Sequence, residues 1–152
     1  MNDNSAVSGM RAAPATSRGR ALGIALWALQ AVLALVFAMA GFAKVGGDAA
    51  MVEMFATIGI GQWFRYVVGA LEIAGAVGVL APRLSGLAAL GLVCLMAGAT
   101  LTNLFVLGAS PLLPLVLLLM GALVAWGRRA RAEALLGHLW HWAFSRVQGH
   151  TR

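Results

Sequence analysis

The stretch ALGIALWALQAVLALVFAMAGFA, residues 21–43, decides the fold because it is apolar from end to end apart from one glutamine. An α-helix rises ~1.5 Å per residue, so a helix of this length covers the ~30 Å hydrocarbon core of a bilayer. A signal peptide is the alternative for an apolar run near the N-terminus. The run is too long for such a signal and has no clear cleavage site, so we expect a retained transmembrane span.

Three further apolar blocks follow, at residues 63–80, 84–107 and 111–126. They are too long and too continuously apolar for the alternating strands of a membrane barrel. In lipid the backbone must satisfy its own hydrogen bonds, which favours helices. Very short connections after the second and third blocks make neighbouring helices antiparallel. The sequence therefore predicts an all-α fold, with a bundle of four antiparallel transmembrane helices in a membrane domain over residues 21–127.

A shorter helix is predicted over residues 49–57, in the loop between the first two blocks. Asp48 stands at the N-cap position, and Gly59 stands where a left-handed residue ends a helix. Apolar residues recur between them at helical spacing: Met51, Met54, Phe55 and Ile58. We expect this amphipathic helix to lie on the outer membrane surface or to cap the bundle.

The overall composition supports a membrane protein. Hydrophobic residues make up 61% and charged residues 11% of the 152 residues, against roughly 25% charged residues in a typical soluble domain. An unusually apolar soluble helical protein is the alternative, but the apolar residues come in blocks long enough to span a bilayer. The single cysteine, Cys94, lies inside such a block, so one chain cannot form a disulfide, a CxxC pair or a cysteine zinc site.

The net charge of +6 could indicate a nucleic-acid partner, but the positions of the basic residues argue against it. They crowd beside the first and last blocks, as topology determinants that touch lipid headgroups do. Residues 1–20 are predicted to be a disordered basic tail. Residues 128–152 are predicted to be a basic tail with an amphipathic helix that lies in the membrane interface or packs against a partner. By the positive-inside rule, both termini are expected in the cytoplasm.

Glu72 is the outstanding polar residue, because it lies near the middle of the second block among small residues. An ionisable side chain at that depth costs about 2.5–3.5 kcal/mol on insertion scales, so it normally faces the bundle interior or a wet cavity. Five other residues complete a candidate polar cluster: Lys44, Arg65, Gln30, Thr100 and Asn103. The cluster is interpreted either as a site for a polar headgroup or a proton, or as hydrogen bonds that fix the register of the helices.

No catalytic constellation accompanies Glu72. The sequence contains no phosphate-binding loop, haem-attachment motif or nucleophile elbow. His138 and His141 share a helical face in the C-terminal tail, but two histidines without a third ligand are usually solvated. No metal site and no catalytic residue are therefore predicted.

Several motifs together resemble those of the DoxX and DoxX-like family of bacterial four-helix membrane proteins. Gly41 precedes Phe-Ala-Lys44, the stretch FATIGI covers residues 55–60, and GALEIAGA containing Glu72 is followed by LAPR at residues 80–83. The resemblance covers residues 22–126, and Gly41, Lys44 and Glu72 are its signature positions. It implies a multi-pass protein of the bacterial inner membrane, often linked to quinone-dependent sulfur oxidation or redox homeostasis. A quinone is the ligand that the resemblance suggests, and the C-terminal tail falls outside the pattern.

Three functions are compatible with these observations. The first is an accessory membrane subunit that binds a quinone or lipid-like molecule through the Glu72 face and is not an enzyme on its own. The second is the membrane subunit of a quinone-linked oxidoreductase, which needs a redox partner. The third is a small transporter or proton path through Glu72, for which four spans would need a homo-oligomer to make a usual pathway.

Overall fold

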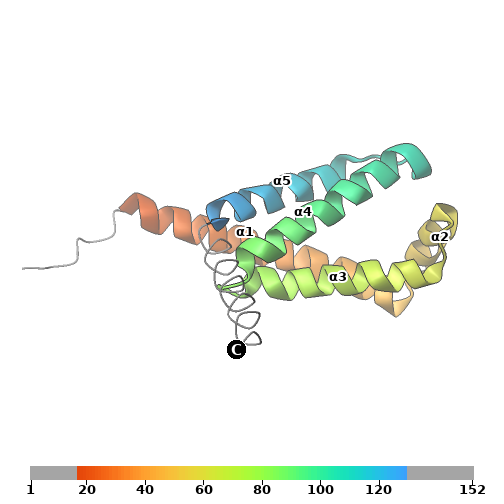
Figure 1. Ribbon diagram of the computed structural model, residues 1–152, viewed down its shortest axis with the longest axis horizontal. Helices are drawn as coiled ribbons and strands as arrows, with labels where there is room; N and C mark the ends of the chain where they lie inside the picture. The colour runs from red at the N-terminus through yellow and green to blue at the C-terminus, as the bar shows by residue number, and fades with distance from the viewer. Residues whose placement is uncertain (1–16, 130–152) are drawn as a thin grey trace, which may run out of the picture.

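The computed structural model describes residues 17–129, with side chains from residue 20 onward, and all its regular elements are helices (Figure 1). The predicted all-α class is confirmed for this part of the chain. In chain order the helices are α1 (Ser17–Gly46), α2 (Ala49–Ile58), α3 (Gln62–Leu80), α4 (Ser85–Thr102), the π-helix η1 (Asn103–Leu107) and α5 (Leu112–Gly127). The predicted C-terminal amphipathic helix and most of the predicted disordered N-terminal tail lie outside the described residues.

Three of the helical segments are long and apolar enough to cross a membrane. They are Arg20–Gly46, Gln62–Leu80 and Ser85–Leu107. The helix α5 has 16 residues, which at ~1.5 Å per residue reach about 24 Å, less than the ~30 Å hydrocarbon core. Length and composition therefore support three spans, and they do not establish the predicted fourth.

The helices form two antiparallel pairs that spread apart toward α2. The helix α1 packs mainly on α3, and α4 packs mainly on α5. Figure 1 shows the two pairs close together at the turn between α3 and α4 and farther apart at the end that carries α2. The helix α2 contacts both α3 and η1 at that end. The arrangement is a wedge whose wide end is covered by α2.

Glycines set the close approach of α1 and α3. A Cβ added to Gly41 would come 2.8 Å from the carbonyl oxygen of Gly69, and one added to Gly69 would come 3.0 Å from the carbonyl oxygen of Gly41. A real Cβ atom at these distances would clash with the carbonyl oxygen or be packed unusually tightly against it. Small residues at facing positions are the usual means by which membrane helices approach closely. This contact fixes the register of the two helices.

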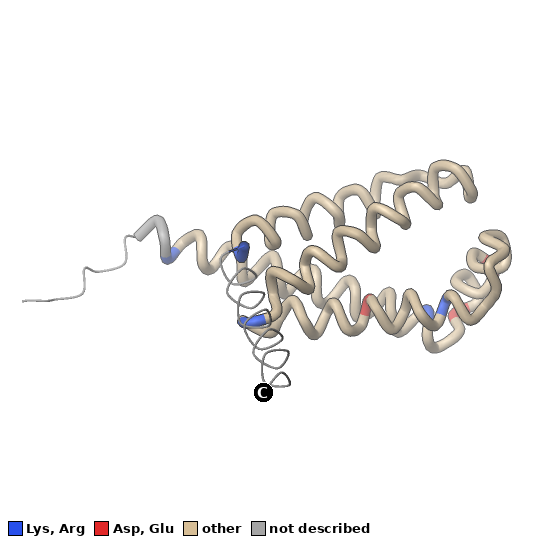
Figure 2. The backbone as a smooth tube through the Cα atoms, in the orientation of Figure 1, with Lys and Arg blue, Asp and Glu red and all other residues tan. Residues whose placement is uncertain are grey.

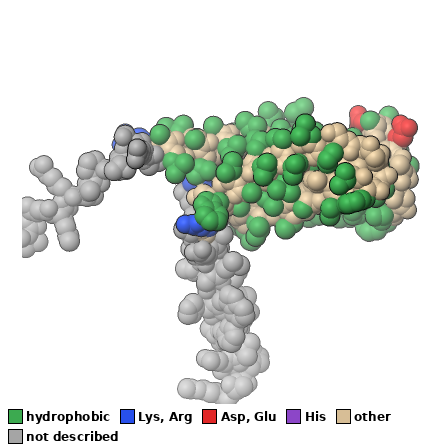
Figure 3. All heavy atoms as spheres, turned by 90° about the horizontal axis from the view of Figure 1, so that it is seen from above, with side chains coloured by type: hydrophobic (Ala, Val, Ile, Leu, Met, Phe, Trp, Pro, Cys, Tyr) green, Lys and Arg blue, Asp and Glu red, His purple; other side chains and the backbone are tan. Residues whose placement is uncertain are grey.

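The core lies where the two pairs meet, while the outer faces of the helices are also apolar. Leu33, Phe37, Val79, Leu92 and Val124 are at most 2% exposed, and they come from α1, α3, α4 and α5. Large apolar side chains also cover the outside of the bundle, and the charged side chains visible in Figure 3 lie near its two ends. A soluble protein rarely exposes an apolar surface of this extent. The outer faces therefore fit contact with lipid.

The short helix α2 begins and ends as its sequence predicts. The carboxylate of Asp48 accepts hydrogen bonds from the backbone N–H groups of Ala50 and Met51, at 3.1 and 3.4 Å. Gly59 follows the last turn with φ +80° and donates its N–H to the carbonyl of Phe55. The buried ring of Phe55 packs at 5.9 Å from that of Phe64 in α3. The apolar face of α2 is thereby turned toward the bundle.

Candidate binding site between the helix pairs

A buried ion pair joins α1 to α3. The ammonium of Lys44, in the last turn of α1, lies 3.0 Å from Oε1 and 2.9 Å from Oε2 of Glu72, in the middle of α3. Glu72 is 3% exposed and Lys44 is 9% exposed. The glycine contact one turn away brings the two helices close enough for this pairing, since a Cβ on Gly69 would lie 3.0 Å from Cβ of Lys44. A paired charge avoids most of the penalty of an isolated charge in an apolar interior.

The ion pair lies on the wall of a cavity of about 490 Å³ between the two helix pairs. All the helices described contribute to its lining, which is mostly aliphatic, aromatic and methionine side chains. The methionines are Met51 and Met54 from α2 and Met96 from α4, whose flexible side chains adapt to ligands of different shapes. A mostly apolar cavity of this size with a few polar groups is the usual form of a small-molecule site.

Two other polar residues line the cavity, and each donates a hydrogen bond to a backbone carbonyl. The hydroxyl of Thr102 donates to the carbonyl of Gly98 at 2.9 Å, and the side-chain amide of Asn103 donates to the carbonyl of Ser110 at 3.0 Å. Thr100, another member of the predicted cluster, donates to the carbonyl of Met96 at 2.7 Å. None of these hydrogen bonds reaches Glu72. In the described part of the chain, Lys44 and Glu72 are therefore the charged groups that face the cavity.

Arg65 is buried close to the cavity without lining it. Its Nε donates to Oε1 of Gln62 at 2.9 Å, and its guanidinium lies 4.3 Å from the centre of the Tyr66 ring. Gln62 in turn donates from Nε2 to the carbonyl of Val52, which ties α3 to α2. The Nη1 atom of Arg65 is buried and has no hydrogen-bond partner among the described residues. Phe64, its neighbour in α3, lines the cavity.

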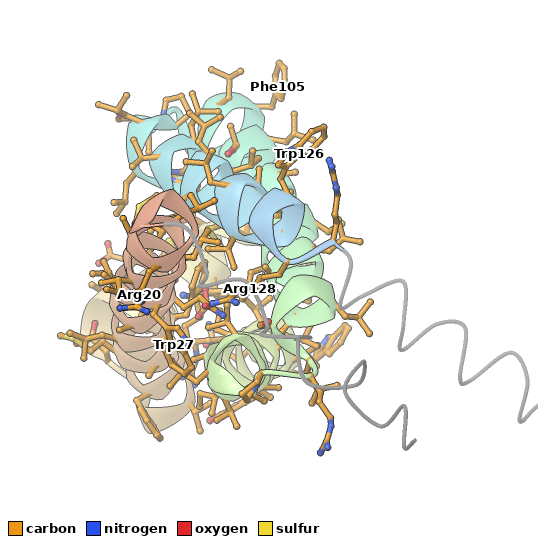
Figure 4. All side chains as sticks on the ribbon, turned by 90° about the vertical axis from the view of Figure 1, so that its left-hand side faces the viewer. Arg20, Trp27, Phe105, Trp126 and Arg128 are labelled. Atoms are coloured by element: carbon orange, nitrogen blue, oxygen red, sulfur yellow. The ribbon has the colours of Figure 1, made fainter. Side chains whose placement is uncertain are left out.

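Gln30 lies in a different part of the bundle from Glu72. Its Nε2 donates to the carbonyl of Val79 at 2.6 Å, and its Oε1 accepts from Nη2 of Arg128 at 2.9 Å. Figure 4 shows Arg128 pointing between the helices, whereas Trp126 points away from them. This junction joins α1, α3 and the residue after α5 at the narrow end of the wedge. The predicted proximity of Gln30 and Glu72 is therefore not observed.

Sequence reasoning missed Arg128 as an interior residue. It was assigned to the basic tail, yet it is 8% exposed. A signal was present, because Gln30 is the one strongly polar residue of its block and a buried amide needs partners. Arg128 follows the last apolar block at the same end of the bundle as Gln30. Nothing in the sequence alone, however, distinguishes it from the neighbouring Arg129.

The residues of the site are suited to binding a molecule, because an ion pair faces a largely apolar cavity. Within residues 17–129, no three His, Cys, Asp or Glu residues are close enough to hold a metal ion. The pair His138 and His141 lies outside the described residues. Lys44 can donate hydrogen bonds to a ligand, and Glu72 can accept them. The cavity can therefore hold an apolar molecule and orient its polar head.

Comparison with known proteins identifies the family. The family model of the DoxX-like family matches residues 28–127, which is more than half of the chain and includes α3, α4, α5 and most of α1. Comparisons with curated proteins and with solved structures gave no match. The resemblance carried by Gly41, Lys44 and Glu72 is thus confirmed, and the chain belongs to the DoxX-like family of proteins with apolar, membrane-spanning helices.

Proposed function

We propose that this protein binds a membrane-dissolved molecule with a polar head and an apolar body, such as a quinone or a lipid-like compound, and serves as an accessory membrane subunit. The observation that carries the proposal is the ion pair of Lys44 and Glu72 on the wall of a 490 Å³ cavity that is otherwise largely apolar. A buried charged pair stabilises a membrane helix bundle little more than apolar packing does. The presence of an ion pair that faces a cavity is therefore better explained by the binding of a ligand than by stability.

The electrostatics suit a head with hydrogen-bond acceptors or donors. The ammonium carries three N–H donors, and a carbonyl or hydroxyl group placed beside it would share them with Glu72. In surroundings of low dielectric constant such a charge-assisted hydrogen bond is stronger than in water. The apolar lining would take the remainder of the molecule. Binding of this kind needs no catalytic group from the chain itself.

The proposal includes a membrane arrangement. We propose that α5 is the fourth span, that the protein lies in the bacterial inner membrane, and that both termini are cytoplasmic. Figure 2 supports this, because Lys and Arg without Asp or Glu mark the end where α1 begins and α5 ends in the described residues, while basic and acidic residues both occur near the end with α2. The positive-inside rule assigns the first of these ends to the cytoplasm.

Labelling of cysteines introduced near residues 10 and 145 in intact cells tests the arrangement. Labelling of either tail by an impermeant reagent would contradict it.

A titration with a benzoquinone analogue tests the binding function. Gly98 lines the cavity, and a Cβ added there meets nothing within 4 Å, so we expect the side chain of Gly98→Leu to extend into the cavity. The matched control is Gly23→Leu, which also has open space but lies in α1 away from the cavity. We expect wild-type protein and Gly23→Leu to bind alike and Gly98→Leu to lose binding. Glu72→Gln should weaken binding. Equal binding by wild type, Gly98→Leu and Glu72→Gln would refute the proposed site.

Two other predicted roles remain predictions, and each has its own test. Co-purification of a redox subunit from native membranes would favour a part in a quinone-linked oxidoreductase. Proton or solute flux in proteoliposomes that is lost in Glu72→Gln would favour a transporter or proton path. No specific contact in the described residues favours either role over binding.

A further inference from the structure

A second hollow lies on the outer face of the bundle between α3 and α4. It is a groove of about 530 Å³, and its walls are apolar. Leu71, Ala74 and Gly91 in these walls are exposed on the outer faces of the helices. On a membrane-spanning bundle this surface faces lipid. The groove is therefore open to the acyl-chain region rather than to water.

The groove and the cavity share part of their lining. Cys94 and Leu95, on α4, line both hollows. Cys94 is exposed and Leu95 is partly exposed. Both residues lie near the middle of α4. These two residues are the lining that the hollows have in common, so the cavity and the groove adjoin at this point of α4.

Small residues keep the groove open. Ala74, Gly75, Ala88 and Gly91 contribute little or no side chain to its walls. A Cβ added to Gly91 would meet nothing within 4 Å, so the space above it is unfilled. Gly75, by contrast, is covered by Leu92, which packs over it. The groove therefore has open space next to Gly91 and none next to Gly75.

We propose that the groove between α3 and α4 holds the apolar tail of the ligand whose head lies at Lys44 and Glu72. The ligand is then a long-chain amphiphile that enters the cavity sideways from the bilayer, past Cys94 and Leu95. This inference rests on the proposed binding function. The occupant follows from the shared lining, because an apolar tail that leaves the cavity past these two residues would come to lie in the groove. The lining of the groove consists of Leu, Ala, Gly and Cys residues, which suits an apolar ligand tail.

The experiment compares two ligands on three variants of the full chain in detergent or lipid nanodiscs. The ligands are the same benzoquinone head without a tail and with a decyl tail. The variants are Gly91→Leu, which fills the groove, Gly98→Leu, which fills the cavity, and Gly23→Leu, which fills neither. All three replace a helical glycine that has open space, so each is expected to fold.

We expect Gly91→Leu to bind the decyl form roughly tenfold more weakly than wild type, the cost of forcing a side chain into occupied space. Its binding of the tail-less form should be unchanged. Gly98→Leu should bind neither form, and Gly23→Leu should bind both. If Gly91→Leu binds the decyl form like wild type while Gly98→Leu does not bind, the tail site is refuted and the cavity site stands. If wild type binds neither form, both proposals fail together.

The oligomeric state is measured on the same samples, because a second copy of the chain is the competing occupant of the groove. A change of oligomeric state in Gly91→Leu, with binding of the decyl form unchanged, would assign the groove to a contact between chains and overturn the inference. An unchanged oligomeric state together with the selective loss of the decyl form supports it.

Discussion

At the scale of single residues, two polar junctions organise the bundle, and they lie in different places. Lys44 pairs with Glu72 beside the cavity, while Gln30 links Val79 and Arg128 at the narrow end. The sequence indicated that Glu72 needs a shielded environment, because a charge in a span is costly. It could not indicate which of several candidates would be the partner. That choice depends on the register of α1 on α3, which is set by close packing of glycines.

The Lys44–Glu72 pair should behave as a coupled unit. Removing one member leaves the other buried without its counter-charge, so Lys44→Met is expected to lower the free energy of unfolding by about 3–5 kcal/mol. The double variant Lys44→Met, Glu72→Gln removes both charges and should lose less than the sum of the two single losses. Thermal unfolding of the three purified variants in one detergent measures the coupling. Strictly additive losses would show that the pair contributes nothing as a pair.

The Gln30 junction should contribute to stability without contributing to binding. Gln30→Leu removes the acceptor used by Arg128 and the donor used by Val79. Loss of a partner in a buried site costs about 1–3 kcal/mol, so the unfolding temperature should fall. Thr100→Val is the control, because that hydroxyl bonds only within its own helix and its loss should matter less. Affinity for the quinone analogue should stay at the wild-type value in both variants. A variant Gln30→Leu as stable as Thr100→Val would contradict the role of the junction.

At the scale of elements, capping and periodicity located the helices well. The pattern from Asp48 to Gly59 placed a short helix at residues 49–57, and α2 is found at Ala49–Ile58. The first helix begins at Ser17, four residues before the predicted start at residue 21. The last turn of the third block is a π-helix, η1, which apolar periodicity alone does not distinguish from an α-helix.

The N-cap of α2 should control the wide end of the cavity. Asp48→Ala removes the carboxylate that accepts from Ala50 and Met51, at a cost of about 1 kcal/mol. The backbone amides of α2 should then exchange faster with deuterium, while those of α3 keep their protection. Glu53→Ala is the matched control, because Glu53 is an exposed acid of the same helix whose side chain caps nothing. Equal exchange in the two variants would show that the cap does not hold α2 in place.

At the scale of the whole molecule, the sequence predicted helices in lipid but not the wedge between them. A pattern of apolar blocks predicts an evenly packed bundle. The structure instead places two tight pairs that spread toward α2 and leaves a cavity between them (Figure 1). The small residues that close α1 on α3 were visible in the sequence. The packing of α4 on α5, and the space it leaves, depend on side chains that are mostly apolar and so carry little distinguishing signal.

The central claim is that a membrane-dissolved ligand fills the cavity beside Lys44 and Glu72. The most direct measurement uses Cys94, the single cysteine of the chain, which lines both the cavity and the groove. The rate at which membrane-permeant N-ethylmaleimide modifies this thiol in proteoliposomes is measured by mass spectrometry, with and without the decyl benzoquinone. The ligand should slow the modification of wild-type protein and have no effect on Gly98→Leu. The same rate with and without ligand in wild-type protein would contradict the account.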